Sequence, residues 1–211
     1  MPNRAARRGR LGTPGFSRET KLERRPGTRE QRTSVLVVTN GIRTEKDYFD
    51  ALRTEPWVAV DTVRIKAMDG APAAVVKRAA DVRDGSEYDE AWVVCDADDF
   101  DVRLAASHAS RHSVKLAVSV PCFEVWLILH LAPGCPGFND ADQAGDYLKR
   151  LVRRWDKTAL RFADFREGVF DAVSRAKRLD RPPEGNPSTD VWRLIEALQT
   201  ASGAQDAVSP T

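Results

Sequence analysis

Residues 93–99 read Val-Val-Cys-Asp-Ala-Asp-Asp, an apolar run that ends in three carboxylates within four residues. The apolar part predicts a buried strand, and such strands in α/β sheets present functional groups at their carboxyl ends. In an extended chain Asp96 and Asp98 point to the same side, where two like charges repel unless a cation lies between them. Hard oxygen ligands suit Mg²⁺ or Mn²⁺, so this stretch predicts a metal site. A helix N-cap is the alternative interpretation, although one Asp would suffice for it.

The rest of the chain alternates between strand and helix patterns on either side of this stretch. Three further apolar runs predict strands at 35–38, 57–66 and 114–120. Helical patterns open at Thr44 and cover 72–83, 103–110 and 123–131. Beyond residue 140 only helical patterns follow, at about 140–155, 163–179 and 188–201. This order predicts an α/β fold with a mainly parallel sheet flanked by helices and a C-terminal helical extension.

Several polar residues receive structural interpretations. Thr44 is expected to cap the first helix, and Ser188 or Thr189 the last one. His130 shares one helix face with large apolar residues, so we expect a buried, hydrogen-bonded histidine or a partner of the helix C-terminus rather than a ligand.

Charge and composition suggest four segments. We expect a basic flexible arm over 1–32, an α/β core over 33–135, a helical portion over 136–201 and a frayed tail over 202–211. The arm holds ten Lys or Arg against three Glu, a net charge of +7, which leaves −5 for the remainder of a chain of net charge +2. An Arg-rich arm gains affinity for phosphate backbones by releasing counterions, so nucleic acid is the expected partner. A solubilising tail, or an arm folded onto the acidic surface, is the alternative.

Several classes of protein are excluded by composition. No run approaches the roughly 20 apolar residues that a membrane span needs, so no membrane partner is expected. The basic N-terminus has no apolar segment behind it and does not resemble a secretory signal. Three cysteines, without CxxC spacing, are expected to be reduced thiols. These features favour a soluble cytoplasmic protein.

Four motifs in order carry a resemblance to a known family. They are Asn-Gly-Ile-Arg-Thr-Glu-Lys-Asp-Tyr-Phe at 40–49, Asp-Ala-Asp-Asp-Phe at 96–100, Ser-Val-Pro-Cys-Phe-Glu-Val-Trp-Leu-Ile-Leu-His at 119–130 and Asn-Pro-Ser-Thr at 186–189. They resemble the EGxxTExxYF, DxDDF, SNPCFExWLLLH and NPST motifs of the RloB-like family, a group that includes abortive-infection proteins.

The resemblance implies a TOPRIM-like core and phosphodiester chemistry. In such cores a Glu after the first strand acts as general acid/base and a DxD motif holds Mg²⁺, which activates water and stabilises the leaving oxygen. Carried over, Asp96 and Asp98 would be metal ligands, Glu124 a further acidic ligand and Glu45 an assisting catalytic residue. The implied function is a Mg²⁺-dependent nuclease effector of bacterial anti-phage defence that works beside an ATPase of the OLD or ABC type.

Two departures from the family pattern leave a second interpretation open. Asn40 stands where the family has its catalytic Glu, and an amide cannot act as a base near neutral pH. Val120 stands where the family has Asn. Glu45 could partly replace the missing Glu. Otherwise the chain would be a catalytically degenerate protein that binds nucleic acid or regulates the partner ATPase. The sequence does not distinguish a DNA target from an RNA target.

Overall fold

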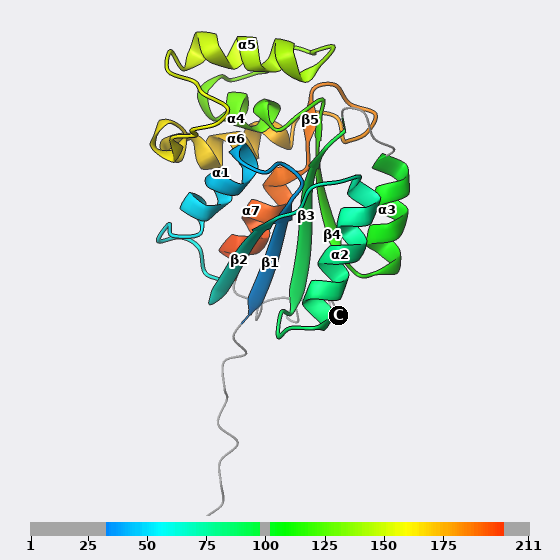
Figure 1. Cartoon of the computed structure of the whole chain (residues 1–211). Coiled ribbons are helices and arrows are strands. Elements are labelled where there is room, and N and C mark those ends of the chain that lie inside the picture. The colour runs from blue at the N-terminus through cyan, green and yellow to red at the C-terminus, as the bar shows by residue number, and fades with distance from the viewer. Residues whose placement is uncertain (1–32, 98–101, 201–211) are drawn as a thin grey trace, which may run out of the picture. The chain divides into compact units, whose positions relative to one another are not determined.

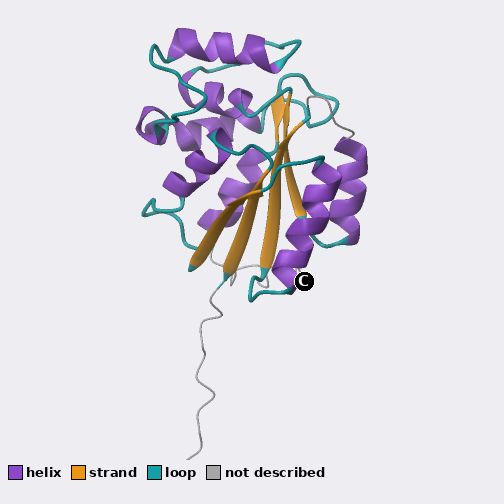
Figure 2. Ribbon diagram, in the orientation of Figure 1, coloured by secondary structure: helices purple, strands orange, loops and turns teal. Residues whose placement is uncertain are grey.

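The computed structural model describes residues 33–97 and 102–200. Its centre is one five-stranded sheet, whose strands are coloured orange in Figure 2. The strands are β1 (Ser34–Thr39), β2 (Thr62–Ala67), β3 (Glu90–Asp96), β4 (Lys115–Val120) and β5 (Ser188–Thr189). They lie in the order β2-β1-β3-β4-β5, with all pairs parallel except β4 with β5. This mostly parallel sheet confirms the predicted fold class and is consistent with a TOPRIM-like core.

The direction in which the chain crosses the sheet explains where the helices lie. From β1 the chain steps to one side to form β2 and then returns past β1 to form β3. Right-handed crossovers therefore place α1 (Thr44–Leu52) and α2 (Pro72–Asp84) on opposite faces. The step from β3 to β4 continues in the second direction, so α3 (Val102–Arg111) covers the same face as α2.

The other face is covered by α1 together with helices from later in the chain. These are α4 (Glu124–Leu131), α6 (Val169–Ala176) and α7 (Val191–Gln199), while α5 (Ala141–Leu151) packs beside α4 (Figure 1). Successive β1 residues enter different cores: Val35 and Val37 join the larger cluster under these helices, and Leu36 and Val38 pack under α2. Burial on both faces explains why β1 is an unbroken apolar run.

The structure corrects several predicted boundaries. The predicted strand over 57–66 begins only at Thr62, because the Val58 and Ala59 N–H groups donate to Glu55 and Leu198 outside the sheet. Helix α5 ends at Leu151 rather than near 155. The predicted helix over 163–179 starts as two short 3₁₀ turns, Phe162–Asp164 and Arg166–Gly168, before α6.

The C-terminal portion is not purely helical, which is a further correction. Ser188–Thr189 forms the edge strand β5 instead of opening the last helix, and the Thr189 and Ser119 hydroxyls lie 2.8 Å apart. The Thr189 hydroxyl also accepts a hydrogen bond from the Val191 N–H, at 3.3 Å, where α7 begins. Asp190, rather than Ser188 or Thr189, occupies the N-cap position of α7, so the predicted cap is wrong.

Thr44 does not cap the first helix. It is already inside α1, whose N-cap position is Arg43, and its hydroxyl donates to the main-chain carbonyl of Lys157 at 2.8 Å. Thr44 therefore joins α1 to a distant loop.

The interpretation of His130 as a buried, satisfied histidine is confirmed. Its Nδ1 donates to the Trp126 carbonyl at 2.9 Å, since a carbonyl can only accept, and its Nε2 accepts from the Tyr48 hydroxyl at 3.0 Å. Burial lowers the pKa of His130 to about 3 and keeps the ring neutral. Within the described residues no helix is long and apolar enough to cross a membrane.

Candidate functional site

The carboxyl ends of β1, β3 and β4 meet at one edge of the sheet, and the predicted site residues follow them. Asn40 comes directly after β1, Asp96 is the last residue of β3, and Glu124 begins the helix after β4. The connection that leaves β1 and the one that leaves β3 run in opposite directions across the sheet. Open α/β sheets bind ligands between two such neighbouring strands. The Asn40 N–H donates to the Val94 carbonyl at 2.9 Å and fixes this junction.

Three carboxylates converge at this edge. Burial is the main cause that raises the pKa of Asp96 well above its ordinary value, and the negative charges of Glu45 and Glu124 raise it further. The pKa of Glu45 is also raised, first by burial and then by Glu124. Glu45 and Glu124 are buried side chains, and Asp96 is half-buried. The structure thus brings together three of the predicted residues into an acidic cluster, Glu45, Asp96 and Glu124.

One oxygen of this cluster has no partner among the residues that the structure describes. Asp96 Oδ1 is buried and has no hydrogen bond to any described residue. A buried oxygen without a partner carries an energetic cost of about 1–3 kcal/mol. A bound cation would remove that cost and the repulsion among the three carboxylates together.

The glycine of the first motif makes room for Glu45. A Cβ atom added to Gly41 would lie 1.8 Å from Oε2 of Glu45, so the carboxylate occupies the space that a side chain at position 41 would fill. The Thr39 hydroxyl donates to the Gly41 carbonyl at 2.9 Å and holds the loop in place. The Asn-Gly pair after β1 therefore positions a carboxylate that comes from α1.

The Asn40 side chain forms its hydrogen bonds with the loop after β2. With its amide oriented so that nitrogen faces the two carbonyls, it donates to Met68 at 3.2 Å and to Gly70 at 2.8 Å. Within the described residues no hydrogen bond joins it to Glu45, Asp96 or Glu124. A glutamate here could not make these bonds, because an ionised carboxylate only accepts. Asn40, which departs from the family motif, thus links the end of β1 to the loop after β2 by hydrogen bonds.

Lys157 is the site residue that sequence reasoning missed. Its Nζ lies 3.4 Å from Oε1 of Glu124, and its side chain is 64% exposed whereas that of Glu124 is 3% exposed. The Thr44 hydroxyl fixes the Lys157 carbonyl from 113 residues away. No motif contains Lys157, and only the excess of basic residues around it could have drawn attention to it.

The remaining predicted ligand, Asp98, lies outside the described residues. Among residues 33–97 and 102–200, no three His, Cys, Asp or Glu side chains are already arranged to hold a metal ion. The roles of all five predicted site residues therefore stay predictions. Cys95, Cys122 and Cys135 are free thiols, and burial raises the pKa of Cys122, which lies beside Glu124.

Comparison with known proteins identifies the family. No curated protein and no solved structure matches the chain. One family model does, the RloB-like protein family, and its match runs over residues 35–198. That range includes every described element except the first residue of β1 and the last of α7. The chain therefore belongs to the RloB-like protein family.

Proposed function

We propose that this protein is a divalent-metal-dependent nuclease that acts as an effector in bacterial anti-phage defence. The observation that supports it is the acidic cluster, in which three carboxylates from three elements meet and a buried oxygen of Asp96 has no partner among the described residues. Keeping like charges together under burial costs stability, and active sites are where such arrangements are retained.

The donor set fits Mg²⁺ or Mn²⁺. Mg²⁺ in phosphoryl-transfer enzymes commonly takes one or two carboxylates and completes its shell with water and substrate phosphate. Asp96 and Glu124 would supply these carboxylates, and Asp98 remains a further candidate ligand. When bound, the ion would neutralise phosphate charge and favour ionisation of a bound water.

The chain's own residues would divide the remaining work. Glu45 is the candidate proton acceptor, because a raised pKa brings a carboxylate closer to the operating pH. The Lys157 ammonium, paired with Glu124 and largely exposed, would contact a phosphate oxygen of the substrate. Asn40 would hold the loop after β2 and take no part in proton transfer.

The second candidate is a degenerate member that binds nucleic acid or regulates a partner ATPase of the OLD or ABC type. It is favoured by Asn40, which replaces the family's catalytic Glu and forms structural hydrogen bonds instead. On this alternative the protein would bind nucleic acid without hydrolysing it, and Asp96, Glu45 and Glu124 would have no catalytic role.

A cleavage screen separates the two. Purified protein would be incubated with DNA and RNA and with Mg²⁺, Mn²⁺ or EDTA, alone and with any neighbouring ATPase. We expect metal-dependent cleavage that Asp96→Asn and Glu45→Gln each reduce by about 10²-fold or more. Asp81→Asn, an exposed carboxylate on α2, is the matched control and should cleave like wild type. Wild type that stays inert on every substrate, with the ATPase present, would support the second candidate.

A further inference from the structure

A strongly basic segment lies beside the acidic cluster and plays no part in the motifs. Residues 149–161, called here the basic segment, contain six Lys or Arg against a single acidic residue, a net charge of +5 in a region otherwise rich in acids. All six basic side chains are exposed. They are Lys149, Arg150, Arg153, Arg154, Lys157 and Arg161.

The contacts of Lys157 place this segment at the site. It begins at the end of α5 and continues through turns to the first 3₁₀ helix (Figure 1). In its middle, the Lys157 carbonyl accepts from Thr44 at 2.8 Å and the Lys157 Nζ lies 3.4 Å from Glu124. The positive charge of the segment therefore reaches the edge of the acidic cluster.

The single acid of the segment does not pair with its basic side chains. The Asp156 carboxylate accepts from the N–H and the hydroxyl of Thr158 at 2.8 and 2.7 Å, within its own turn. In the part of the chain that the structure describes, Arg153, Arg154 and Arg161 form no ion pair. Three guanidinium groups are thus available to an anion in solution.

An acidic cluster repels the phosphates of the very substrate that the proposed function requires. Two unit charges 4 Å apart interact by about 4 kcal/mol at an effective dielectric constant of 20, so a substrate held there needs compensating positive charge nearby. Guanidinium groups suit this role because their planar fork matches phosphate oxygens.

We propose that the basic segment binds the sugar–phosphate backbone of nucleic acid and leads it to the acidic cluster, with Lys157 at the junction. The second part, that the strand is led to the acidic cluster, rests on the proposed function. The first part assigns backbone binding to the folded domain rather than to residues 1–32 alone. Phosphate contacts position the strand without reading its sequence.

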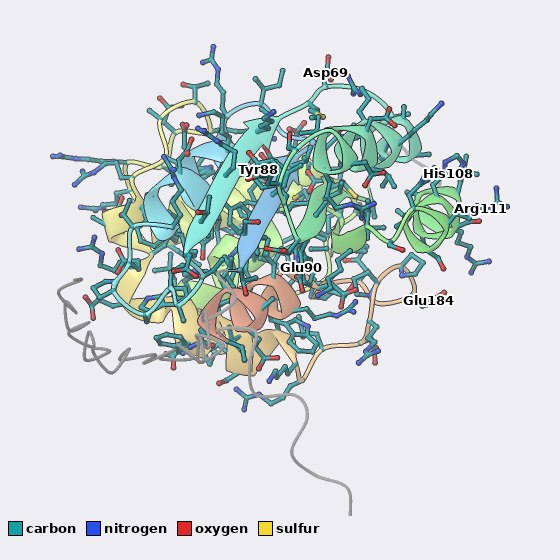
Figure 3. The ribbon with its side chains drawn as sticks, turned by 90° about the horizontal axis from the view of Figure 1, so that it is seen from below. Asp69, Tyr88, Glu90, His108, Arg111 and Glu184 are labelled. Atoms are coloured by element: carbon teal, nitrogen blue, oxygen red, sulfur yellow. The ribbon has the colours of Figure 1, made fainter. Side chains whose placement is uncertain are left out.

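Fluorescence anisotropy of the full chain in EDTA tests the inference without any chemistry. The test variant is Arg153→Ala/Arg154→Ala, and the control is Lys77→Ala/Arg111→Ala, which removes the same charge from exposed positions on α2 and α3. Figure 3 labels Arg111 on α3, in the layer on the other side of the sheet. Single-stranded RNA, single-stranded DNA and duplex DNA serve as separate probes.

We expect the test variant to weaken binding at least about tenfold at low salt while the control changes little. The dependence of log K on log salt should become shallower by about 1.4 on single strands or 1.8 on duplex DNA, because two phosphate contacts are lost. Arg161→Ala, at the far end of the segment, should show about half of this change in slope. Thermal melts check that each variant is folded.

Three outcomes would overturn the inference: unaltered binding by the test variant, equal loss in the control, or no binding of any probe by wild type. Cleavage is measured separately with Mg²⁺. If wild type binds through the basic segment but never cleaves, the nuclease proposal fails and the binding surface stands. If wild type cleaves and the test variant loses neither binding nor activity, the nuclease proposal stands and the proposed binding surface fails.

Discussion

Glu45 reaches the acidic cluster only because residue 41 has no side chain. Its carboxylate lies where a Cβ of residue 41 would be, while the neighbouring Asn40 donates hydrogen bonds to the loop after β2. Two adjacent residues after β1 thus perform separate tasks. One leaves space for a carboxylate from α1, and the other holds two loops together.

Gly41→Ala should displace Glu45 and leave the fold intact. The atoms that the new methyl group would meet are the far end of a flexible side chain, so the carboxylate moves and the backbone does not. We expect nuclease activity to fall about as far as in Glu45→Gln, roughly 10²- to 10⁴-fold, with the melting temperature nearly unchanged. Gly145→Ala on α5 is the control, because no atom lies within 4 Å of its added Cβ. Full activity in Gly41→Ala would remove Glu45 from the catalytic residues.

Asn40→Glu should cost stability and change the rate little. A carboxylate cannot donate to the carbonyls of Met68 and Gly70, and leaving such partners unpaired costs about 1–3 kcal/mol. A loss of this size corresponds to a fall of about 2–12 °C in melting temperature for a chain of this length. Asn40→Gln, which keeps an amide donor, is the control for the change in side-chain length.

The opposite outcome for Asn40→Glu is equally informative. A gain in cleavage of about 10²-fold or more would mean that Asn40 had disabled a general base and that Glu45 had not replaced it. Wild type and variant both inert on every nucleic acid would favour the binding protein.

At the scale of elements, the site is a junction between strand ends and one loop from the C-terminal half. The strand ends could be predicted, because apolar runs mark β1, β3 and β4, and parallel connections bring their carboxyl ends to the same edge. The loop around Lys157 could not, because the contacts that hold it come from distant parts of the chain, among them the Thr44 hydroxyl of α1, 113 residues earlier. The edge strand β5 was missed for a similar reason. Two residues carry no periodicity, and Ser119, the partner of Thr189, lies 70 residues away.

Thr44→Val should loosen the basic segment without disturbing the sheet. The change keeps the shape of the side chain but removes the donor to the Lys157 carbonyl. We expect amide exchange in residues 152–161 to accelerate, the protein to lose about 0.5–1.5 kcal/mol of stability, and affinity for nucleic acid to drop. Thr54→Val is the control, since the Thr54 hydroxyl bonds to Ala51 within its own turn. Unchanged exchange in 152–161 would mean that other contacts position this segment.

For the whole molecule, the acidic cluster makes stability depend on pH and, if the proposed function holds, on a bound cation. The pKa values of Asp96 and Glu45 are raised in the folded protein, so the unfolded chain releases these protons at lower pH. Folding is therefore favoured below the ordinary carboxyl pKa of about 4, and that contribution is lost as pH rises from there through the folded pKa. At neutral pH without a cation, the charged cluster opposes folding.

Asp96→Asn should consequently have opposite effects with and without metal. In EDTA at neutral pH it removes one of three clustered charges, so we expect the variant to melt higher than wild type. Mg²⁺ or Mn²⁺ should raise the melting temperature of wild type, by the equivalent of about 2.7 kcal/mol at a concentration of 100 times Kd, and should leave the variant unmoved. Asp81→Asn serves again as control and should follow wild type in both buffers. Differential scanning calorimetry over a pH series with each cation measures all of this. If Asp96→Asn is instead less stable in EDTA and wild type gains nothing from the cation, Asp96 serves the fold through its hydrogen bonds, and the metal site must be abandoned.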